Sequence, residues 1–333
     1  MMSCLILITC GVLVFAAPTT AEDASQGKGV ELISVTRIWD QAPHNAFTGL
    51  VYHNDVWYCA FREGVGHVCP DGALRVLGSK DGASWEPLAL LTSDTADLRD
   101  AQLSVTPSGE LMLSGAAALH DRTEHSHQSL AWFSKDGREW SDPVAIGDPD
   151  FWLWRVTWHK GTAYAVGYAT SDNRMIRLYT SVDGRRFDTL VENLFDEGYP
   201  NETSLVFLED DSVMCLLRRD GTDATAQLGL SKPPYTDWAW KGLGVKIGGP
   251  HAIQLPNGRF VAGVRLYDEQ VRTALCRLDP EAGKIEEILA LPSGGDTSYP
   301  GLVWHEDTLW MSYYSSHEER ASIYLAKIGL SEP

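Results

Sequence analysis

The chain repeats one pattern of hydrophobic and polar positions about every fifty residues. In each copy, an alternating run rich in aromatic and β-branched residues leads into a polar turn, and a second such run follows. The first copy covers residues 49–58 and the second covers residues 103–112. Short polar turns between alternating runs predict β-hairpins. The turns of the six copies lie at Asp55, Gly109, Gly161, Asp211, Gly258 and Asp307, which are 54, 52, 50, 47 and 49 residues apart.

A period near fifty residues with several strands in each unit is typical of β-propellers. Six copies therefore predict an all-β fold, a six-bladed β-propeller that occupies residues 30–333 as one domain. The segment Val30–Trp39 reads as a strand without a hairpin partner. We expect it to complete the last blade, which ends near Ile328, and so to close the ring. Two stacked β-sandwiches would be the alternative, but the sequence contains no linker between halves.

The first 21 residues have no charged side chain, and their apolar block, Leu5–Ala16, is followed by small residues and then Glu22. The block is shorter than the roughly 20 residues that span a membrane. This outline predicts a signal peptide over residues 1–21 and a linker over residues 22–29. We therefore expect a secreted or periplasmic protein without membrane attachment once the leader is removed.

The net charge of −18 argues against nucleic acid and anionic membranes as partners, since both require a positive surface. Cysteines outside the leader lie at positions 59, 69, 215 and 276, without the spacing of metal ligands. A Cys59–Cys69 disulfide and buried free thiols are both compatible with this spacing. We expect a monomer that needs no metal and no cofactor.

A second motif follows the hairpin in three of the repeats, at Ser79–Trp85, Ser134–Trp140 and Ser181–Phe187. Its Ser and Asp side chains are expected to accept backbone hydrogen bonds, its Gly allows a positive φ, and its aromatic residue packs on the blade. These segments resemble the Asp-box of the sialidase superfamily. The resemblance implies a sialidase-like propeller, and it assigns the motif a structural role.

Two positions in each blade of a propeller lie at the same mouth of the central channel: the start of the innermost strand and the end of the next strand. Charged and aromatic residues occupy these positions in all six repeats, which predicts a polar, arginine-rich pocket. The strand starts carry His44–Asn45, Arg99–Asp100, Trp154–Arg155, Asn201–Glu202, Pro250–His251 and Ser298–Tyr299. The strand ends carry Arg62–Glu63, His120–Asp121, Tyr168, Arg218–Arg219, Arg265, and Tyr314 with His317.

Two of these segments resemble the catalytic segments of sialidases, which use a tyrosine nucleophile, a glutamate base, an aspartate acid/base and three arginines. Residues 201–218 resemble the glutamate segment and the arginine that follows it, which implies roles for Glu202 and Arg218. Residues 296–302 resemble the nucleophile segment and imply Tyr299. A phenol with a pKa of about 10 needs such a carboxylate to accept its proton during attack.

The segment around Arg62, with the loop through His67 and Asp71 to Arg75, resembles the first-blade arginine and acid/base loop of the family. The resemblance implies Arg62 as a substrate ligand and Asp71 as the acid/base. His67 is the alternative, because Pro-Asp-Gly is also an ordinary turn sequence.

The chain departs from the family at residues 44–47, where sialidases carry an arginine and this sequence has none. The third arginine of the triad is Arg265 or Arg272. Arg155 and Arg99 could hold a carboxylate from other blades. Tyr314 and His317 complete the predicted substrate-binding set.

Together these features predict an exported retaining glycosidase that removes an acidic sugar, sialic acid or a related one. Tyr299 would attack the anomeric carbon with the help of Glu202, and Asp71 would protonate the leaving oxygen. One alternative is a carbohydrate-binding propeller without catalysis. Another is a uronate lyase in which Tyr299 works with His251 or His317.

Overall fold

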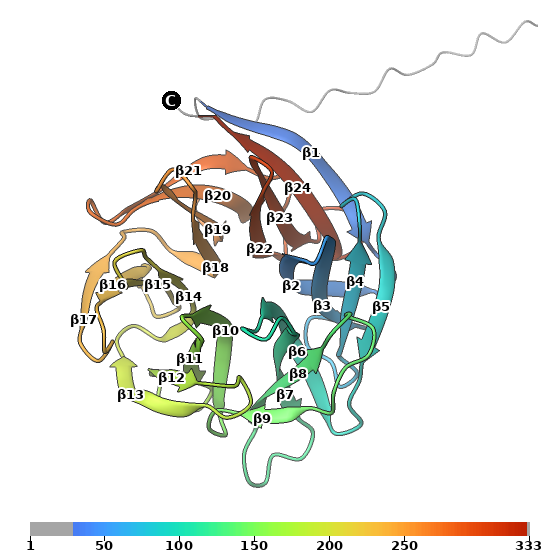
Figure 1. Cartoon of the computed structure of the whole chain (residues 1–333), viewed down its shortest axis with the longest axis horizontal. Coiled ribbons are helices and arrows are strands. Elements are labelled where there is room, and N and C mark those ends of the chain that lie inside the picture. The colour runs from blue at the N-terminus through green and yellow to red at the C-terminus, as the bar shows by residue number, and fades with distance from the viewer. Residues whose placement is uncertain (1–28, 332–333) are drawn as a thin grey trace, which may run out of the picture.

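The computed structural model describes residues 29–331 and consists of six four-stranded antiparallel sheets arranged around a central axis (Figure 1). The predicted six-bladed propeller is therefore confirmed. Within these residues no helix is long and apolar enough to cross a membrane. The predicted signal peptide and all but the last residue of the predicted linker lie outside the described residues.

Each of the first five blades uses four consecutive strands, ordered from the axis outward. Blade 1 contains β2 (His44–His53), β3 (Val56–Gly64), β4 (Ala73–Ser79) and β5 (Glu86–Leu91). Blade 2 contains β6 (Ala96–Val105), β7 (Leu111–Leu119), β8 (His127–Ser134) and β9 (Val144–Ile146). Blade 3 contains β10 (Phe151–His159), β11 (Thr162–Ala169), β12 (Ile176–Ser181) and β13 (Asp188–Phe195). Blade 4 contains β14 (Pro200–Phe207), β15 (Val213–Arg219), β16 (Gln227–Ser231) and β17 (Trp238–Gly242). Blade 5 contains β18 (Ile247–Gln254), β19 (Phe260–Leu266), β20 (Arg272–Asp279) and β21 (Lys284–Ala290).

The last blade joins the two ends of the described chain. It contains β22 (Thr297–His305), β23 (Thr308–Ser315) and β24 (Ser322–Leu330), and β1 (Val30–Trp39) is its outermost strand. The register runs from Val30 opposite Leu330 to Trp39 opposite Ile323. This pairing confirms the closure predicted from the unpartnered first strand, and it fixes the sixth blade beside the first.

The three predicted turns have the expected hydrogen bonds. In the first of them, the Asp81 Oδ1 atom accepts hydrogen bonds from the amides of Ala83 and Ser84 at 2.8 and 2.7 Å. The Gly82 amide donates to Ser79 Oγ at 2.9 Å, and Gly82 has a φ of +66°. The turns at Asp136 and Asp183 repeat these bonds. Their role in the fold is structural.

The four cysteines of the described chain are buried free thiols. Burial raises the pKa of the Cys59 thiol to about 12, so the group stays protonated. Of the two alternatives that the sequence left open, the structure has the free thiols.

Near the axis the inner strands of neighbouring blades approach closely, and glycines make room for them. A Cβ atom on Gly301 of β22 would lie 2.5 Å from the Leu50 backbone nitrogen on β2. A Cβ atom on Gly49 would lie 2.9 Å from the Leu103 nitrogen on β6. Since the obstructing atoms belong to backbone, a larger residue would force the blades apart.

We predict that Gly301→Ala lowers the free energy of unfolding by about 1–3 kcal/mol, the usual cost of overpacking a dense core. Chemical denaturation followed by tryptophan fluorescence measures the change. Gly242→Ala on the exposed outer strand β17 is the matched control, because the closest atom to its Cβ lies at 3.6 Å. Equal stabilities of the two variants would contradict the proposed close packing at the axis.

Candidate active site

All six innermost strands lose their regular pairing at the same mouth of the channel. In each of them, two residues lie between the paired positions without a partner of their own. These pairs are Phe47–Thr48, Asp100–Ala101, Arg155–Val156, Asn201–Glu202, Gly249–Pro250 and Tyr299–Pro300. Such bulges redirect side chains and are frequent beside active sites.

Five of the six bulges place their first residue in the left-handed region of backbone space. The φ angles are +64° at Phe47, +56° at Asp100, +52° at Arg155, +53° at Gly249 and +50° at Tyr299. Non-glycine residues adopt such angles at a cost of about 1–3 kcal/mol when the surrounding fold fixes them. The repeated strain turns a ring of side chains toward one point.

Glycine at the bulge of β18 is required by the tyrosine of the next blade. A Cβ atom on Gly249 would lie 2.8 Å from Tyr299 Cγ. The amide of Gly249 donates to Glu202 Oε2 at 2.9 Å. The missing side chain therefore leaves space for the Tyr299 ring, and the backbone amide holds the carboxylate that faces it.

The predicted pair of Tyr299 and Glu202 is assembled by blades 6 and 4. The Tyr299 hydroxyl donates to Glu202 Oε1 at 2.6 Å, and both residues are buried. Arg218 on β15 donates from Nη1 to Glu202 Oε2 at 2.7 Å and to the Tyr299 oxygen at 2.9 Å. One guanidinium thus contacts both the group that would lose a proton and the group that would accept it.

Burial and the nearby charge of Glu202 raise the pKa of Tyr299 well above its ordinary value, although Arg218 and Arg265 act in the opposite direction. The phenol is therefore protonated at neutral pH. It can act as a nucleophile only when a base accepts its proton as the new bond forms, and Glu202 lies within reach to do so.

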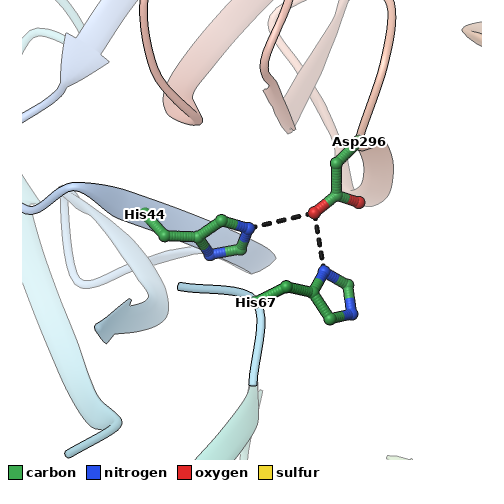
Figure 2. Close-up of side chains that lie close together, drawn as sticks. All are labelled: His44, His67 and Asp296. Atoms are coloured by element: carbon green, nitrogen blue, oxygen red, sulfur yellow. Dashed lines mark hydrogen bonds and ion pairs between the residues drawn. The ribbon is translucent and has the colours of Figure 1, made fainter. Parts of the chain in front are cut away.

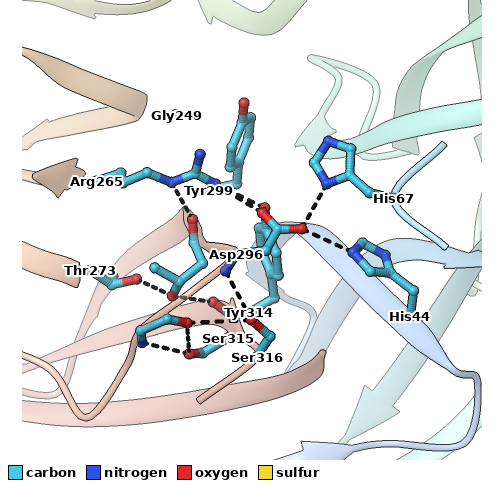
Figure 3. Close-up of polar contacts among 12 residues, drawn as sticks. His44, His67, Gly249, Arg265, Thr273, Asp296, Tyr299, Tyr314, Ser315 and Ser316 are labelled. Atoms are coloured by element: carbon cyan, nitrogen blue, oxygen red, sulfur yellow. Dashed lines mark hydrogen bonds and ion pairs between the residues drawn. The ribbon is translucent and has the colours of Figure 1, made fainter. Parts of the chain in front are cut away.

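A second cluster adjoins this pair and is centred on Asp296, immediately before β22 (Figure 3). Its Oδ1 atom accepts a hydrogen bond from the Tyr314 hydroxyl at 2.5 Å, and Arg265 Nη2 lies 3.3 Å away. Its Oδ2 atom lies 3.0 Å from His44 Nε2 and 2.6 Å from His67 Nδ1 (Figure 2). Burial would raise the pKa of Asp296, but hydrogen bonds from His44, His67 and Tyr314 outweigh burial and hold it well below its ordinary value.

The same three residues offer the best metal-ligand geometry in the described chain. One ligand atom from each of His44, His67 and Asp296 lies within 4.8 Å of the other two. Two imidazoles and a carboxylate could hold a transition-metal ion. In this structure His44 and His67 are both hydrogen bonded to Asp296 Oδ2, and these two bonds account for the positions of the three side chains.

Two further charged residues border the Tyr299–Glu202 pair from blades 2 and 3. Burial raises the pKa of Asp100 to about 7, with Arg99 opposing and Glu202 adding to the shift. Its Oδ1 atom is buried without a hydrogen-bond partner. Arg155 donates to the carbonyl of Pro300, and burial lowers its pKa to about 9 against the attraction of Glu202 and Asp100.

Arg62 requires a correction. Its side chain is 0 % exposed, and its guanidinium donates to Asp97 Oδ1, the Gly66 carbonyl and Cys69 Sγ, each at 2.8 Å. The side chain has no exposed surface for a substrate, and its hydrogen bonds support the loop around residue 66 instead.

The acid/base assignment also changes. Asp71 is exposed, and hydrogen bonds from Cys69 and from the backbone of Val65 lower its pKa, so its contacts lie within its own loop. His67, the alternative, is the residue of this loop that reaches the cluster. Its ring lies 5.2 Å from that of Phe47, which in turn lies 5.0 Å from that of Tyr299.

The other predicted site residues fall into two groups. Arg265, Tyr314 and Arg99 lie at the pocket, and Arg99 stacks over Phe47 at 5.4 Å and donates to the His67 carbonyl at 3.1 Å. Arg272, the alternative to Arg265, forms ion pairs with Asp268 and Glu287 away from the cluster. His317 bonds Ser315, and His251 Nδ1 accepts a hydrogen bond from the amide of Leu302. Within residues 29–331, neither histidine is hydrogen bonded to Tyr299.

A hollow of about 1040 Å³ between blades 4 and 5 is lined by Leu208, Leu230, Trp238 and Phe260, among others. None of its lining residues belongs to the ring of bulges. The converging polar groups therefore place the candidate active site at the channel mouth and not in this hollow.

Sequence reasoning gave no role to Asp296, His44 or Asp100. His44 and Asp100 lie in segments that the repeat placed at the mouth, and Asp296 begins the segment that resembles the nucleophile segment. The signal that could have found them is a carboxylate or imidazole near a strand start, a position where a solvent-facing side chain is equally common.

No protein-family model and no curated protein matches the sequence. A protein of unknown function from Dyadobacter fermentans is similar in structure, with a TM-score of 0.82, 20% identity, and coverage of 91% of this chain and 100% of that one. The α-L-arabinofuranosidase of Fusarium graminearum with an iminosugar inhibitor gives a TM-score of 0.70, 14% identity, and coverage of 90% and 99%. Trypanosoma rangeli sialidase gives 0.69, 13%, and coverage of 92% and 60%.

These similarities show the fold, a six-bladed propeller of the kind found in sialidases and in the arabinofuranosidase. Two of the structures named above, the arabinofuranosidase and the sialidase, are glycoside hydrolases. The identities are too low to transfer a substrate.

We predict that Asp100→Asn stabilises the protein more at pH 8 than at pH 4. The pKa of Asp100 is about 7 in the folded chain and about 4 when unfolded, so the native state binds more protons and loses stability as pH rises through this window. The free energy of unfolding falls by on the order of 4 kcal/mol, and the uncharged amide of the asparagine variant avoids this loss. Thermal melts at the two pH values test this, with the exposed Asp142→Asn as control. A gain that does not depend on pH would contradict the buried ionisation.

Proposed function

We propose that the protein is a retaining glycoside hydrolase in which Tyr299 is the nucleophile and Glu202 is its base. The observation that carries the proposal is the buried 2.6 Å hydrogen bond from the Tyr299 hydroxyl to Glu202 Oε1. In addition, Arg218 contacts both oxygens and would stabilise negative charge as it shifts from the carboxylate to the phenol and back. The glycosidases among the similar structures agree with this class of reaction.

The proposed reaction has two displacements at the anomeric carbon. In the first, the Tyr299 oxygen attacks while Glu202 accepts the phenolic proton, the glycosidic bond breaks, and the leaving oxygen takes a proton from the acid. In the second, water attacks the same carbon and gives a proton to the acid/base, the bond to Tyr299 breaks, and Glu202 returns the proton to the phenol. Two inversions give overall retention.

We assign the acid/base role to His67 in place of Asp71. Asp296 accepts a hydrogen bond from His67 Nδ1, which fixes the orientation of the ring. The Nε2 atom is then the group that would donate to a leaving oxygen. The side chain is 48% exposed, so a leaving group at the mouth of the channel could reach it.

The expectation of an acidic sugar came from the resemblance to sialidases and from the arginines predicted at the channel mouth. An acidic sugar requires arginines that are not already paired with carboxylates of the protein. The proposal that a glycosidic bond is broken does not depend on this condition.

We predict that Tyr299→Phe lowers kcat on a cleavable nitrophenyl glycoside about a thousandfold or more, because the variant has no nucleophile. Tyr52→Phe, at the far end of β2, is the matched control. Proton NMR of the first product formed by the wild type should show the anomer of the substrate. Full activity of Tyr299→Phe, or an inverted product, would rule out the proposed mechanism.

A second prediction separates the acid from the nucleophile. His67→Ala should lower kcat/KM about 10²–10⁴-fold on alkyl glycosides, whose leaving groups need a proton, and far less on nitrophenyl glycosides. His53→Ala, at the opposite end of blade 1, is the control. Equal losses on both kinds of substrate would assign His67 a structural role.

A further inference from the structure

Asp296 provides a carboxylate at the place where an acidic substrate would need to bind. The residue lies where β22 begins, beside Tyr299, and its amide donates to Ser316 Oγ at 2.8 Å. The side chain of the next residue, Thr297, donates to the carbonyl of Tyr314 at 2.6 Å. These bonds hold the segment in place, as Figure 3 shows, so the carboxylate has a fixed position.

The donors on this side of the pocket are already directed at Asp296. Arg265 and Tyr314 face its Oδ1 atom, and His44 and His67 face its Oδ2 atom. Arg265 also donates from Nε to the carbonyl of Thr297 at 2.6 Å. Cationic and polar groups that would otherwise suit a sugar carboxylate therefore have an internal partner.

The remaining arginines of the pocket are compensated in the same way. Arg218 pairs with Glu202 at 2.7 Å and with Asp220 at 2.9 Å. Arg99 lies 3.5 Å from Asp97, which also pairs with the buried Arg62.

Among the residues that the structure describes, no carboxylate forms an ion pair with Arg155, but the charges of Glu202 and Asp100 both act on it. It is buried, and its side chain is directed to the carbonyl of Pro300. The pocket as a whole therefore lacks a surplus of positive charge.

An anionic sugar would either displace Asp296 from Arg265 or lie beside it as a second negative charge. Both outcomes are unfavourable in a partly buried site, where like charges repel strongly. A neutral sugar meets no such barrier and can use the polar groups as hydrogen-bond partners.

From this charge balance we infer that the site takes an uncharged sugar and that Asp296 is the residue that excludes acidic ones. This inference rests on the proposed glycosidase function and replaces the acidic substrate expected from the sequence. The specificity of the pocket for uncharged sugars then depends on the Asp296 carboxylate, which already occupies Arg265.

Matched ligands that differ only in charge test the inference. Isothermal titration would compare methyl glucuronoside with its methyl ester, and sialic acid with its methyl ester, on the wild-type protein. We expect at least one ester to bind about tenfold or more tightly than its acid. Tighter binding of an acid than of its ester, or equal binding of all four ligands, would overturn the inference.

The variant Asp296→Asn keeps the shape of the side chain and removes its charge. We expect it to bind the acids about tenfold or more tightly than the wild type does, with less change for the esters. Asp142→Asn removes the same charge from an exposed turn of blade 2 and should change neither affinity. Affinity for the acids that stays at the wild-type value in Asp296→Asn would overturn the role of Asp296.

Turnover keeps this inference separate from the proposed function. A panel of nitrophenyl pentosides and hexosides, a glucuronide and a sialoside would be assayed with the wild type and with Tyr299→Phe. Cleavage of neutral glycosides that is lost in Tyr299→Phe supports both. Faster cleavage of the acidic glycosides than of the neutral ones would overturn the inference but would still support the proposed function. No cleavage of any glycoside counts against the proposed function, and the titrations still decide the question of charge.

Discussion

The site depends on one backbone constraint, a bulge at the same place in all six innermost strands. A regular strand would alternate its side chains between the two faces of the blade. The bulge interrupts this alternation and gives Tyr299 and Arg155 a positive φ, while Gly249 leaves the space that the Tyr299 ring needs. Closure of the ring by β1 and β24 holds the blades together, so the strain of each bulge is balanced by packing on both sides.

Compensated charge is the second feature of the site. The pocket buries several arginines and carboxylates, and each buried ion would be costly without a partner. Arg218 bridges Tyr299 and Glu202, and Asp296 accepts hydrogen bonds from donors of blades 1, 5 and 6. This arrangement holds His67 and Tyr299 among paired charges. In the proposed function, the same pairings would also restrict the sugars that the site accepts.

The sequence predicted the scaffold well because its signals are periodic. Six hairpin turns gave the number of blades, and the unpaired strand Val30–Trp39 gave the closure. The meeting of Tyr299 with Glu202 followed from the repeat together with a family resemblance, and the structure places them in contact.

The contacts of individual side chains were less predictable, because a one-residue slip in register has no sequence signature. The bulge lies at Phe47 and Gly249, where the repeat suggested His44–Asn45 and Pro250–His251. The sequence also does not show which side chains form ion pairs or hydrogen bonds with each other. Arg62 resembles a substrate ligand in the sequence, yet its guanidinium donates to Asp97 and Cys69.

The central claim is that Tyr299 forms a bond to the sugar. A neutral glycosyl fluoride that also carries fluorine at the carbon next to the anomeric centre should slow the second displacement and trap the intermediate. Proteolysis and mass spectrometry would then locate the attached sugar. We expect the sugar to be attached to the Tyr299 oxygen in the wild type and no attached sugar in Tyr299→Phe. A label on Glu202 or another residue, or turnover of the fluoride without any label on Tyr299, would contradict it.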